Sequence, residues 1–201
     1  MMPISAREIE DRSFNIIQQC GLQPNQAIDL RIVASVLGAN VVERTLDADV
    51  SGVLIVKGNE RHILVNQEHS SQRRRFTISH EFGHLVLHNM SNDRMIVDTD
   101  IRVYQRVGQA SSSAYSEVGA TTTPREEREA NLFAASLLMP AQWLQTAASE
   151  LHDDESFVET LAKMFDVSEQ ACFIRLQQLN IIESYIAHDY GKSRRQQTMT
   201  F

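Results

Sequence analysis

Hydrophobic residues recur along the chain with two different spacings, and these spacings predict helices near the start and a small sheet after them. Residues 5–20 and 29–38 repeat with the helical period, and each of these stretches is followed by or ends in a glycine. The segment 51–66 instead contains two β-branched, apolar runs on either side of Gly58-Asn59. Such runs around a turn dipeptide predict an antiparallel hairpin.

The second half of the chain is predicted to be mainly helical. Residues 72–88 are apolar nearly all round, which is typical of a buried helix. The irregular stretch 89–123 follows, in which 95–104 predict a short strand. Four further helices are predicted at 124–138, 141–148, 157–165 and 168–179. Helices and an antiparallel sheet in separate parts of the chain indicate an α+β fold.

Composition narrows the classes of protein that fit. The chain has 201 residues, enough for a full core, and a net charge of −7, which argues against a broad surface for nucleic acid. Its two cysteines, Cys20 and Cys172, are too far apart in sequence to suggest a disulfide framework or a cysteine zinc site. The polar N-terminus is unlike a secretory signal, and no run approaches the ~18–20 apolar residues that cross a bilayer. We therefore expect a cytoplasmic protein without a membrane segment.

The most informative motif is His80-Glu81-Phe82-Gly83-His84, within the predicted helix 72–88. Two histidines four positions apart lie on one face of a helix, so both rings can reach one metal ion. Glu81 between them can act on a water that the metal holds. This arrangement is typical of a zinc-dependent hydrolase, although a structural helix can also carry the pattern by chance.

A catalytic zinc ion takes three protein ligands, so a third must come from elsewhere in the chain. His88 continues the stripe, but it lies about 12 Å along the helix axis from His80, while zinc–nitrogen bonds are ~2 Å. His88 is therefore predicted to support a ligand or to end the helix. Helix 124–138 is a better source, because its inner face carries Glu126 and Glu127. A buried acid is costly unless positive charge meets it.

Three charged segments have a structural interpretation beside a functional one. Acids at a helix start are typically exposed, which suits Glu129 and is the alternative interpretation of Glu126 and Glu127. The run Arg73-Arg74-Arg75 is predicted to be solvated, with binding of a phosphate or an acidic partner as the alternative. The residue spacing in 161–179 resembles that of a helix-turn-helix. The acidic surroundings of this segment favour a pair of packed helices over a DNA-binding motif.

The histidine motif and the sequence from Glu127 to Pro140, which includes Ala130-Asn131 and ends in Leu-Leu-Met-Pro, together resemble the ImmA/IrrE family of metallopeptidases. The resemblance covers roughly residues 10–182. It implies a zincin-like, gluzincin-type domain at 1–150, whose small antiparallel sheet packs on the motif helix. A C-terminal helical subdomain resembling a helix-turn-helix is expected at 151–190, and a disordered tail at 191–201.

The same resemblance implies roles for individual residues. His80, His84 and Glu127 would hold Zn²⁺, Glu81 would be the general base, and Asn131 would support a ligand. Three further side chains could polarise the carbonyl oxygen of a substrate, and the sequence does not select among them: His88, Tyr104 and Tyr115.

Members of this family cleave helix-turn-helix repressors. The resemblance therefore implies an XRE-type repressor as substrate and the release of stress-response or mobile-element genes. The sheet edge around 53–65 is expected to receive an extended peptide by strand addition. The alternative is a non-proteolytic zinc-binding regulator that binds protein or DNA, with DNA the less favoured partner. Glu81 favours the peptidase, because a pure binder has no need of a base.

Overall fold

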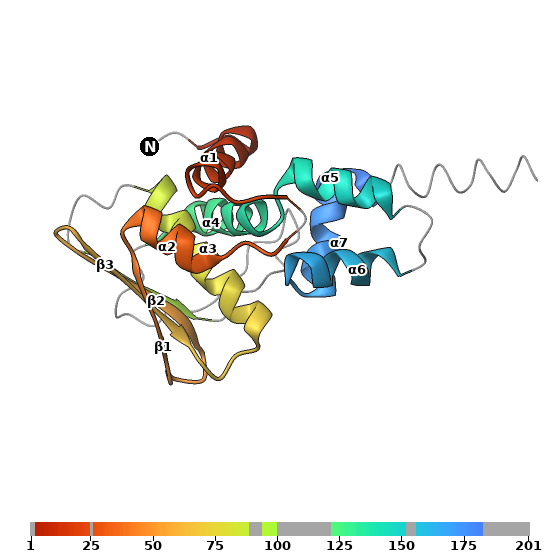
Figure 1. The fold of residues 1–201 in the computed structure, drawn as a ribbon. Coiled ribbons are helices and arrows are strands. Elements are labelled where there is room, and N and C mark those ends of the chain that lie inside the picture. Colours follow the sequence, from red (N-terminus) through yellow and green to blue (C-terminus); the bar gives the residue numbers. More distant parts are fainter. Residues whose placement is uncertain (1–2, 25, 89–93, 100–121, 152–155, 183–201) are drawn as a thin grey trace, which may run out of the picture.

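The secondary structure follows the predicted order of helices and strands, in a computed structural model that describes residues 3–24, 26–88, 94–99, 122–151 and 156–182 (Figure 1). The helices are α1 (Ala6–Gln19), α2 (Leu30–Leu37), α3 (Ser71–Leu87), α4 (Pro124–Leu138), α5 (Ala141–Glu150), α6 (Phe157–Phe165) and α7 (Glu169–Gln178). The strands are β1 (Asn40–Arg44), β2 (Val50–Lys57), β3 (Glu60–Asn66) and β4 (Arg94–Thr99). The fold is α+β, as predicted.

Helix boundaries are fixed by local chemistry. The Ser5 side chain accepts a hydrogen bond from the backbone N–H of Glu8 at 3.2 Å and so caps α1. Thr123 and Glu126 form a reciprocal capping box at the start of α4, where Pro124 occupies the first turn. Helix α2 ends at Gly38, whose φ of 62° is the left-handed conformation that a glycine adopts without strain. These short-range signals explain why the predicted helices form.

The four strands are ordered β1-β3-β2-β4. The β2–β3 hairpin turns at Gly58 as predicted, and β4 pairs antiparallel with the other side of β2. The expectation of a purely antiparallel sheet is wrong, because β1 lies beside β3 and runs parallel to it. The expectation of a free edge around 53–65 is also wrong. Both β2 and β3 have neighbours on each side, so β1 and β4 are the outer strands of the described sheet.

Helix α3 lies between the sheet and α4, and α1 packs on α4 (Figure 1). Helices α3 and α4 approach closely at Gly83, where an added Cβ would lie 2.9 Å from the Cα of Ala130. The core between these layers contains fully buried side chains from both helices and from the sheet, among them Leu54, Ile63, Phe82 and Phe133. The small residues at the crossing therefore set the distance between the two helices that carry the predicted site.

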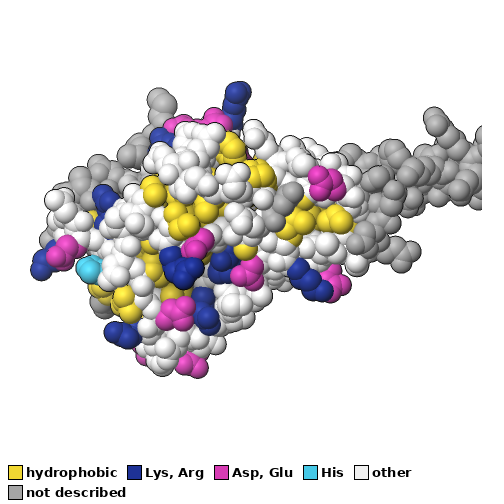
Figure 2. All heavy atoms as spheres, in the orientation of Figure 1, with side chains coloured by type: hydrophobic (Ala, Val, Ile, Leu, Met, Phe, Trp, Pro, Cys, Tyr) yellow, Lys and Arg dark blue, Asp and Glu magenta, His cyan; other side chains and the backbone are white. Residues whose placement is uncertain are grey.

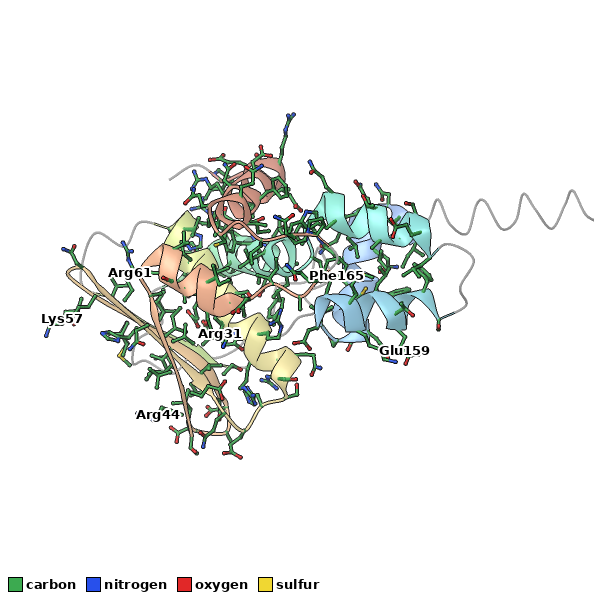
Figure 3. The ribbon with its side chains drawn as sticks, viewed as in Figure 1. Arg31, Arg44, Lys57, Arg61, Glu159 and Phe165 are labelled. Carbon is green, nitrogen blue, oxygen red and sulfur yellow. The ribbon has the colours of Figure 1, made fainter. Side chains whose placement is uncertain are left out.

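The C-terminal helices α5, α6 and α7 lie together at one end of the molecule (Figure 1). Arg175 of α7 is 1% exposed and pairs with Glu10 of α1, with N···O distances of 2.7 and 2.8 Å. Figure 3 shows that Phe165 lies within the assembled helices, whereas Lys57 and Arg44 lie at the outer rim of the sheet. The ion pair between Arg175 and Glu10 joins α7 to α1.

The predicted solvated run Arg73-Arg74-Arg75 is wrong as an interpretation, because each guanidinium has a partner elsewhere in the fold. Arg73 donates to Ser51 Oγ at 3.0 Å, and Arg74 donates to the carbonyl of His69 at 2.8 Å. Arg75 donates to the backbone carbonyls of Ile28 and Asp166 and lies 3.2 Å from the Asp166 carboxylate. The run connects α3 to the sheet and to the turn between α6 and α7.

The molecular surface carries charges of both signs. On the face shown in Figure 2, basic and acidic side chains are interspersed rather than gathered in a basic stripe. None of the described helices is long and apolar enough to cross a membrane.

Candidate metal centre

Helix α3 brings the two histidines of the motif together in the interior. His80 and His84 are fully buried, with ring centroids 4.7 Å apart and their Nε2 atoms 3.0 Å apart. Their spacing of four residues places both rings on one face of α3, as the sequence predicts. Both Nε2 atoms are therefore directed at the same point.

Helix α4 supplies Glu127 to the same point. One carboxylate oxygen lies 3.2 Å from Nε2 of His80, and the other lies 3.5 Å from Nε2 of His84. Burial alone would raise the pKa of Glu127, but its contact with His80 and the charges of His80 and His84 lower that pKa to about 2. The structure thus brings together the three residues that the sequence nominates as ligands.

A fourth side chain, Asp98 of β4, was not predicted. Its Oδ2 lies 3.4 Å from Nε2 of His80, and the residue is 6% exposed. The candidate ligand atoms of His80, His84, Asp98 and Glu127 all lie within 4.8 Å of one another. A weak sequence signal exists: Asp98 is two residues after buried Ile96, so both side chains lie on the same face of the strand.

Glu81 lies beside this group and is fully buried. Neither of its carboxylate oxygens has a hydrogen-bond partner among the described residues. Gly52 of β2 makes room for it, because a Cβ there would lie 3.0 Å from Oε1 of Glu81. Burial raises the pKa of Glu81 well above its usual range, and the nearby carboxylate of Asp98 raises it further.

The donor set fits a divalent metal ion. Three acids, Glu81, Asp98 and Glu127, share a buried site with two imidazoles, and the pKa of Asp98 is raised by burial. The charges of Asp98 and Glu127 raise the pKa of His80, although burial acts in the opposite direction. Imidazole nitrogens with carboxylate oxygens are ligands that zinc and related metals accept, and a cation would offset the surplus negative charge.

Each histidine is held by a further side chain. Nδ1 of His80 lies 2.9 Å from Oδ1 of Asn131, one turn after Glu127 on α4. The amide oxygen can only accept, so His80 carries its proton on Nδ1 and turns the lone pair of Nε2 toward the centre. The structure therefore places Asn131 where the sequence predicts, in contact with a candidate ligand.

His84 is held by a chain of buried groups. Its Nδ1 lies 3.0 Å from Nδ1 of His88, whose Nε2 lies 3.2 Å from Oε2 of Glu129. Oε1 of Glu129 accepts a hydrogen bond from the backbone N–H of Ile4 at 3.1 Å. Burial lowers the pKa of His88, so its ring is neutral and accepts the proton that His84 donates from Nδ1.

These contacts decide two expectations about nearby residues. His88 contacts the candidate ligand His84 and ends α3, and it does not face the shared point itself. The interpretation of Glu129 as an exposed acid is wrong, because it is 7% exposed and accepts hydrogen bonds from two segments distant in sequence. Glu126, expected to be an exposed acid, is half-buried and forms the capping box of α4 with Thr123. Tyr104 and Tyr115 lie outside the described residues.

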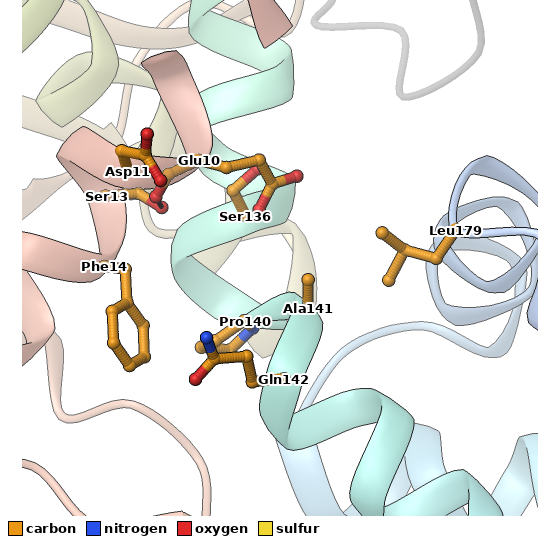
Figure 4. A pocket seen from close by; sticks show the side chains of 9 residues that line it. All are labelled: Glu10, Asp11, Ser13, Phe14, Ser136, Pro140, Ala141, Gln142 and Leu179. Atoms are coloured by element: carbon orange, nitrogen blue, oxygen red, sulfur yellow. Dashed lines mark hydrogen bonds between the residues drawn. The ribbon is translucent and has the colours of Figure 1, made fainter. Parts of the chain in front are cut away.

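A pocket of about 230 Å³ lies where α1, the end of α4 and the start of α5 meet (Figure 4). None of the residues of the candidate metal centre lines it. Its serines are already engaged, since Ser13 donates to the carbonyl of Glu10 at 3.0 Å and Ser136 to that of Leu132 at 2.8 Å. This pocket is therefore separate from the centre.

The chain resembles known proteins in sequence and in fold. It matches the family model of the M78 peptidases, described as the IrrE N-terminal-like domain, over residues 34–177. No curated protein matches the chain significantly. Among solved structures, a Mycobacterium tuberculosis transcriptional regulator is similar with a TM-score of 0.52 and 14% identity. The match covers 85% of this chain but 47% of that protein, about half its length, and it bears on the fold alone.

Proposed function

Because the chain belongs to the IrrE N-terminal-like family of M78 peptidases, we propose that it is a zinc-dependent endopeptidase. The observation that carries the proposal is the convergence of His80, His84 and Glu127 on one point, with the unpartnered carboxylate of Glu81 beside it. A structural helix pair would gain nothing from burying these acids together, since each buried carboxylate costs free energy unless a cation meets it.

In the proposed reaction, His80, His84 and Glu127 would hold Zn²⁺. When bound, the metal supplies an acidified water and an electrophile for the peptide carbonyl. Glu81 accepts the proton of the attacking water and then delivers it to the leaving amine. Asn131 keeps the Nε2 lone pair of His80 turned inward throughout.

We propose a protein substrate of the helix-turn-helix repressor class, of the XRE type, whose cleavage would derepress stress-response or mobile-element genes. An extended segment of that substrate would add to β4, which is an outer strand of the described sheet and carries Asp98 at the centre. Strand addition next to the zinc ion would bring a peptide carbonyl within reach of Glu81.

We further propose the finer architecture that the resemblance implies. Residues 1–150 would form a zincin-like, gluzincin-type domain, and 151–190 a subdomain with helix-turn-helix cadence that completes the core. Support comes from Arg175, which a DNA reader would expose but which is buried against Glu10. The proposed tail 191–201 lies outside the described residues.

The test compares Glu81→Gln with the matched exposed control Glu68→Gln. Purified protein is incubated with the repressor encoded next to its gene, and cleavage is followed by mass spectrometry while bound metal is measured by elemental analysis. We expect Glu81→Gln to keep its metal and to lose about 10²–10⁴-fold in cleavage rate. The control should equal the wild type.

Three results would contradict the proposal. Cleavage by Glu81→Gln at the wild-type rate would make the mechanism wrong. Metal binding that survives replacement of both His80 and His84 would remove the centre. The third result is a wild type that binds metal without cleaving the repressor and that shifts the band of DNA in a gel-shift assay. That result would favour a regulator that acts by binding.

A further inference from the structure

We propose that Asp98 is a fourth protein ligand of the metal centre, carried by β4 to the position that a catalytic zinc site leaves for water. The inference rests on the proposed function, because it assumes that His80, His84 and Glu127 hold a metal ion.

Asp98 lies at a distance from Nε2 of His80 that suits two ligands of one metal ion. Around a tetrahedral ion with bonds of ~2.0–2.1 Å, neighbouring donor atoms lie about 3.3–3.4 Å apart. Oδ2 of Asp98 is 3.4 Å from Nε2 of His80, and the nearer oxygen of Glu127 is 3.2 Å from the same nitrogen. Asp98 therefore approaches Nε2 of His80 about as closely as Glu127 does, and the ligand atoms of all four residues lie within 4.8 Å of one another.

Among the described residues, the group of opposite charge that acts on Asp98 is the ring of His80, itself a candidate ligand. Oδ2 of Asp98 is buried and has no hydrogen-bond partner among the described residues. The ionisable groups that act on it are His80, Glu81 and Glu127, and two of these are acids. A buried carboxylate beside two others is stable only if a cation or protons intervene. A metal ion at the shared point would satisfy this oxygen directly.

The sheet is built to direct Asp98 inward. Asp98 pairs with Gly52 of β2, and the register of β2 against β4 shifts between Val50 and Gly52. Such a bulge re-aims side chains and is frequent beside active sites. Gly52 has no side chain, and a Cβ there would lie 2.6 Å from Cγ2 of Thr77 and 3.0 Å from Oε1 of Glu81.

Four protein ligands would change the chemistry of the centre. A structural zinc site is closed by four protein ligands, whereas a catalytic site keeps one position open. Asp98 would thus compete with water for that position, and hydrolysis would require its carboxylate to withdraw or the coordination to expand to five.

The experiment measures metal affinity for the full chain carrying Asp98→Asn, with exposed Asp49→Asn as the matched control. Affinity for Zn²⁺ is obtained by competition with a chromophoric chelator, and coordination is followed by the visible absorption of bound Co²⁺. We expect Asp98→Asn to weaken Zn²⁺ binding about tenfold or more, at least as much as loss of a residue that supports a ligand. Its Co²⁺ spectrum should differ from that of the wild type and of the control.

A second variant and two further measurements keep the test decisive. Asp98→Ala removes the oxygen that an asparagine could still offer, and it should weaken binding at least as much. Unfolding of the metal-free protein checks folding, and Asp98→Asn should not lower its midpoint. At saturating Zn²⁺, hydrolysis by Asp98→Asn is expected to rise above that of the wild type, because water gains the position.

Unchanged affinity and an unchanged Co²⁺ spectrum in both Asp98 variants would overturn the inference. The proposed function would survive that result, provided that replacement of His80 and His84 still abolishes binding. Lost hydrolysis with unchanged affinity would also overturn it, because Asp98 would then act on Glu81 or on substrate.

Discussion

Two regions of this molecule bury charged side chains, and they balance the charge in opposite ways. At the junction of α1 and α7, the guanidinium of Arg175 meets both carboxylate oxygens of Glu10 and donates from Nε to the carbonyl of Met139 at 3.2 Å. Positive and negative charge are matched there, and every nitrogen of the guanidinium has an acceptor. The charges in this region are therefore neutralised by residues of the chain itself.

The candidate metal centre is unbalanced. Three carboxylates, those of Glu81, Asp98 and Glu127, face imidazole rings, and both oxygens of Glu81 have no hydrogen-bond partner among the described residues. A buried pair that is closed supports the fold, whereas a buried cluster with surplus negative charge requires a cation. The difference distinguishes a structural from a functional use of buried charge, and each side of it can be tested.

The largest effect is expected at the balanced junction. Arg175→Met keeps much of the side-chain volume but leaves Glu10 without its partner. Removing one member of a buried pair costs about 3–5 kcal/mol, and because the side chain of Glu10 is 26% exposed, the free energy of unfolding in urea should fall by about 3 kcal/mol. The double variant Arg175→Met with Glu10→Gln should recover part of the loss. A fall below about 1 kcal/mol would mean that the pair does not hold α7 to α1.

At the candidate metal centre, removal of a carboxylate is expected to stabilise the metal-free protein, which is the opposite of the effect at Arg175. The raised pKa values of Glu81 and Asp98 mean that the folded protein keeps protons that the unfolded chain releases, so stability falls as pH rises above about 4.5. The raised pKa of His80 adds a loss above about 6.5. The lowered pKa of Glu127 acts the other way, and its contribution is lost as pH falls from about 4.5 to about 2.

Glu81→Gln should therefore stabilise the metal-free protein, by about 2 kcal/mol near pH 8 and by little near pH 4.5. Urea unfolding in the presence of a chelator, repeated across this pH range, measures the difference. The exposed change Glu68→Gln serves as control and should give a flat difference. If Glu81→Gln destabilises the metal-free protein at high pH, its carboxylate has a partner and the centre is balanced without metal.

The two regions also differ in how far the sequence predicts them. The motif His80-Glu81-Phe82-Gly83-His84 and the cap residues act over one or two helical turns, so local spacing alone indicates the helix and the converging rings. The assumption that two apolar helices meet through their small residues brings Glu126 and Glu127 opposite these rings, and the family resemblance selects Glu127. The meeting of Gly83 with Ala130 bears out that assumption.

The sequence contains no comparable local pattern that predicts contacts between segments far apart in the chain. Asp98 reaches the centre because β4 pairs with β2, and the partner of a strand cannot be read from its own residues. The parallel pairing of β1 with β3 was missed for the same reason. Glu129 looked like an exposed acid because its partners, His88 and the backbone of Ile4, lie 41 and 125 positions away in the chain.

The smallest effect is expected where charge and metal are linked indirectly, at His88. His88→Phe removes the acceptor of the Nδ1 proton of His84 and leaves Glu129 without its buried donor. Loss of such a supporting contact lowers metal affinity about tenfold, which corresponds to about 1.4 kcal/mol. Chelator competition with Zn²⁺ measures this, and His62→Phe on the sheet surface is the matched control, which should bind as the wild type does. Equal affinities in the two variants would show that His84 is oriented without His88, and that the chain to Glu129 belongs with the balanced, structural contacts.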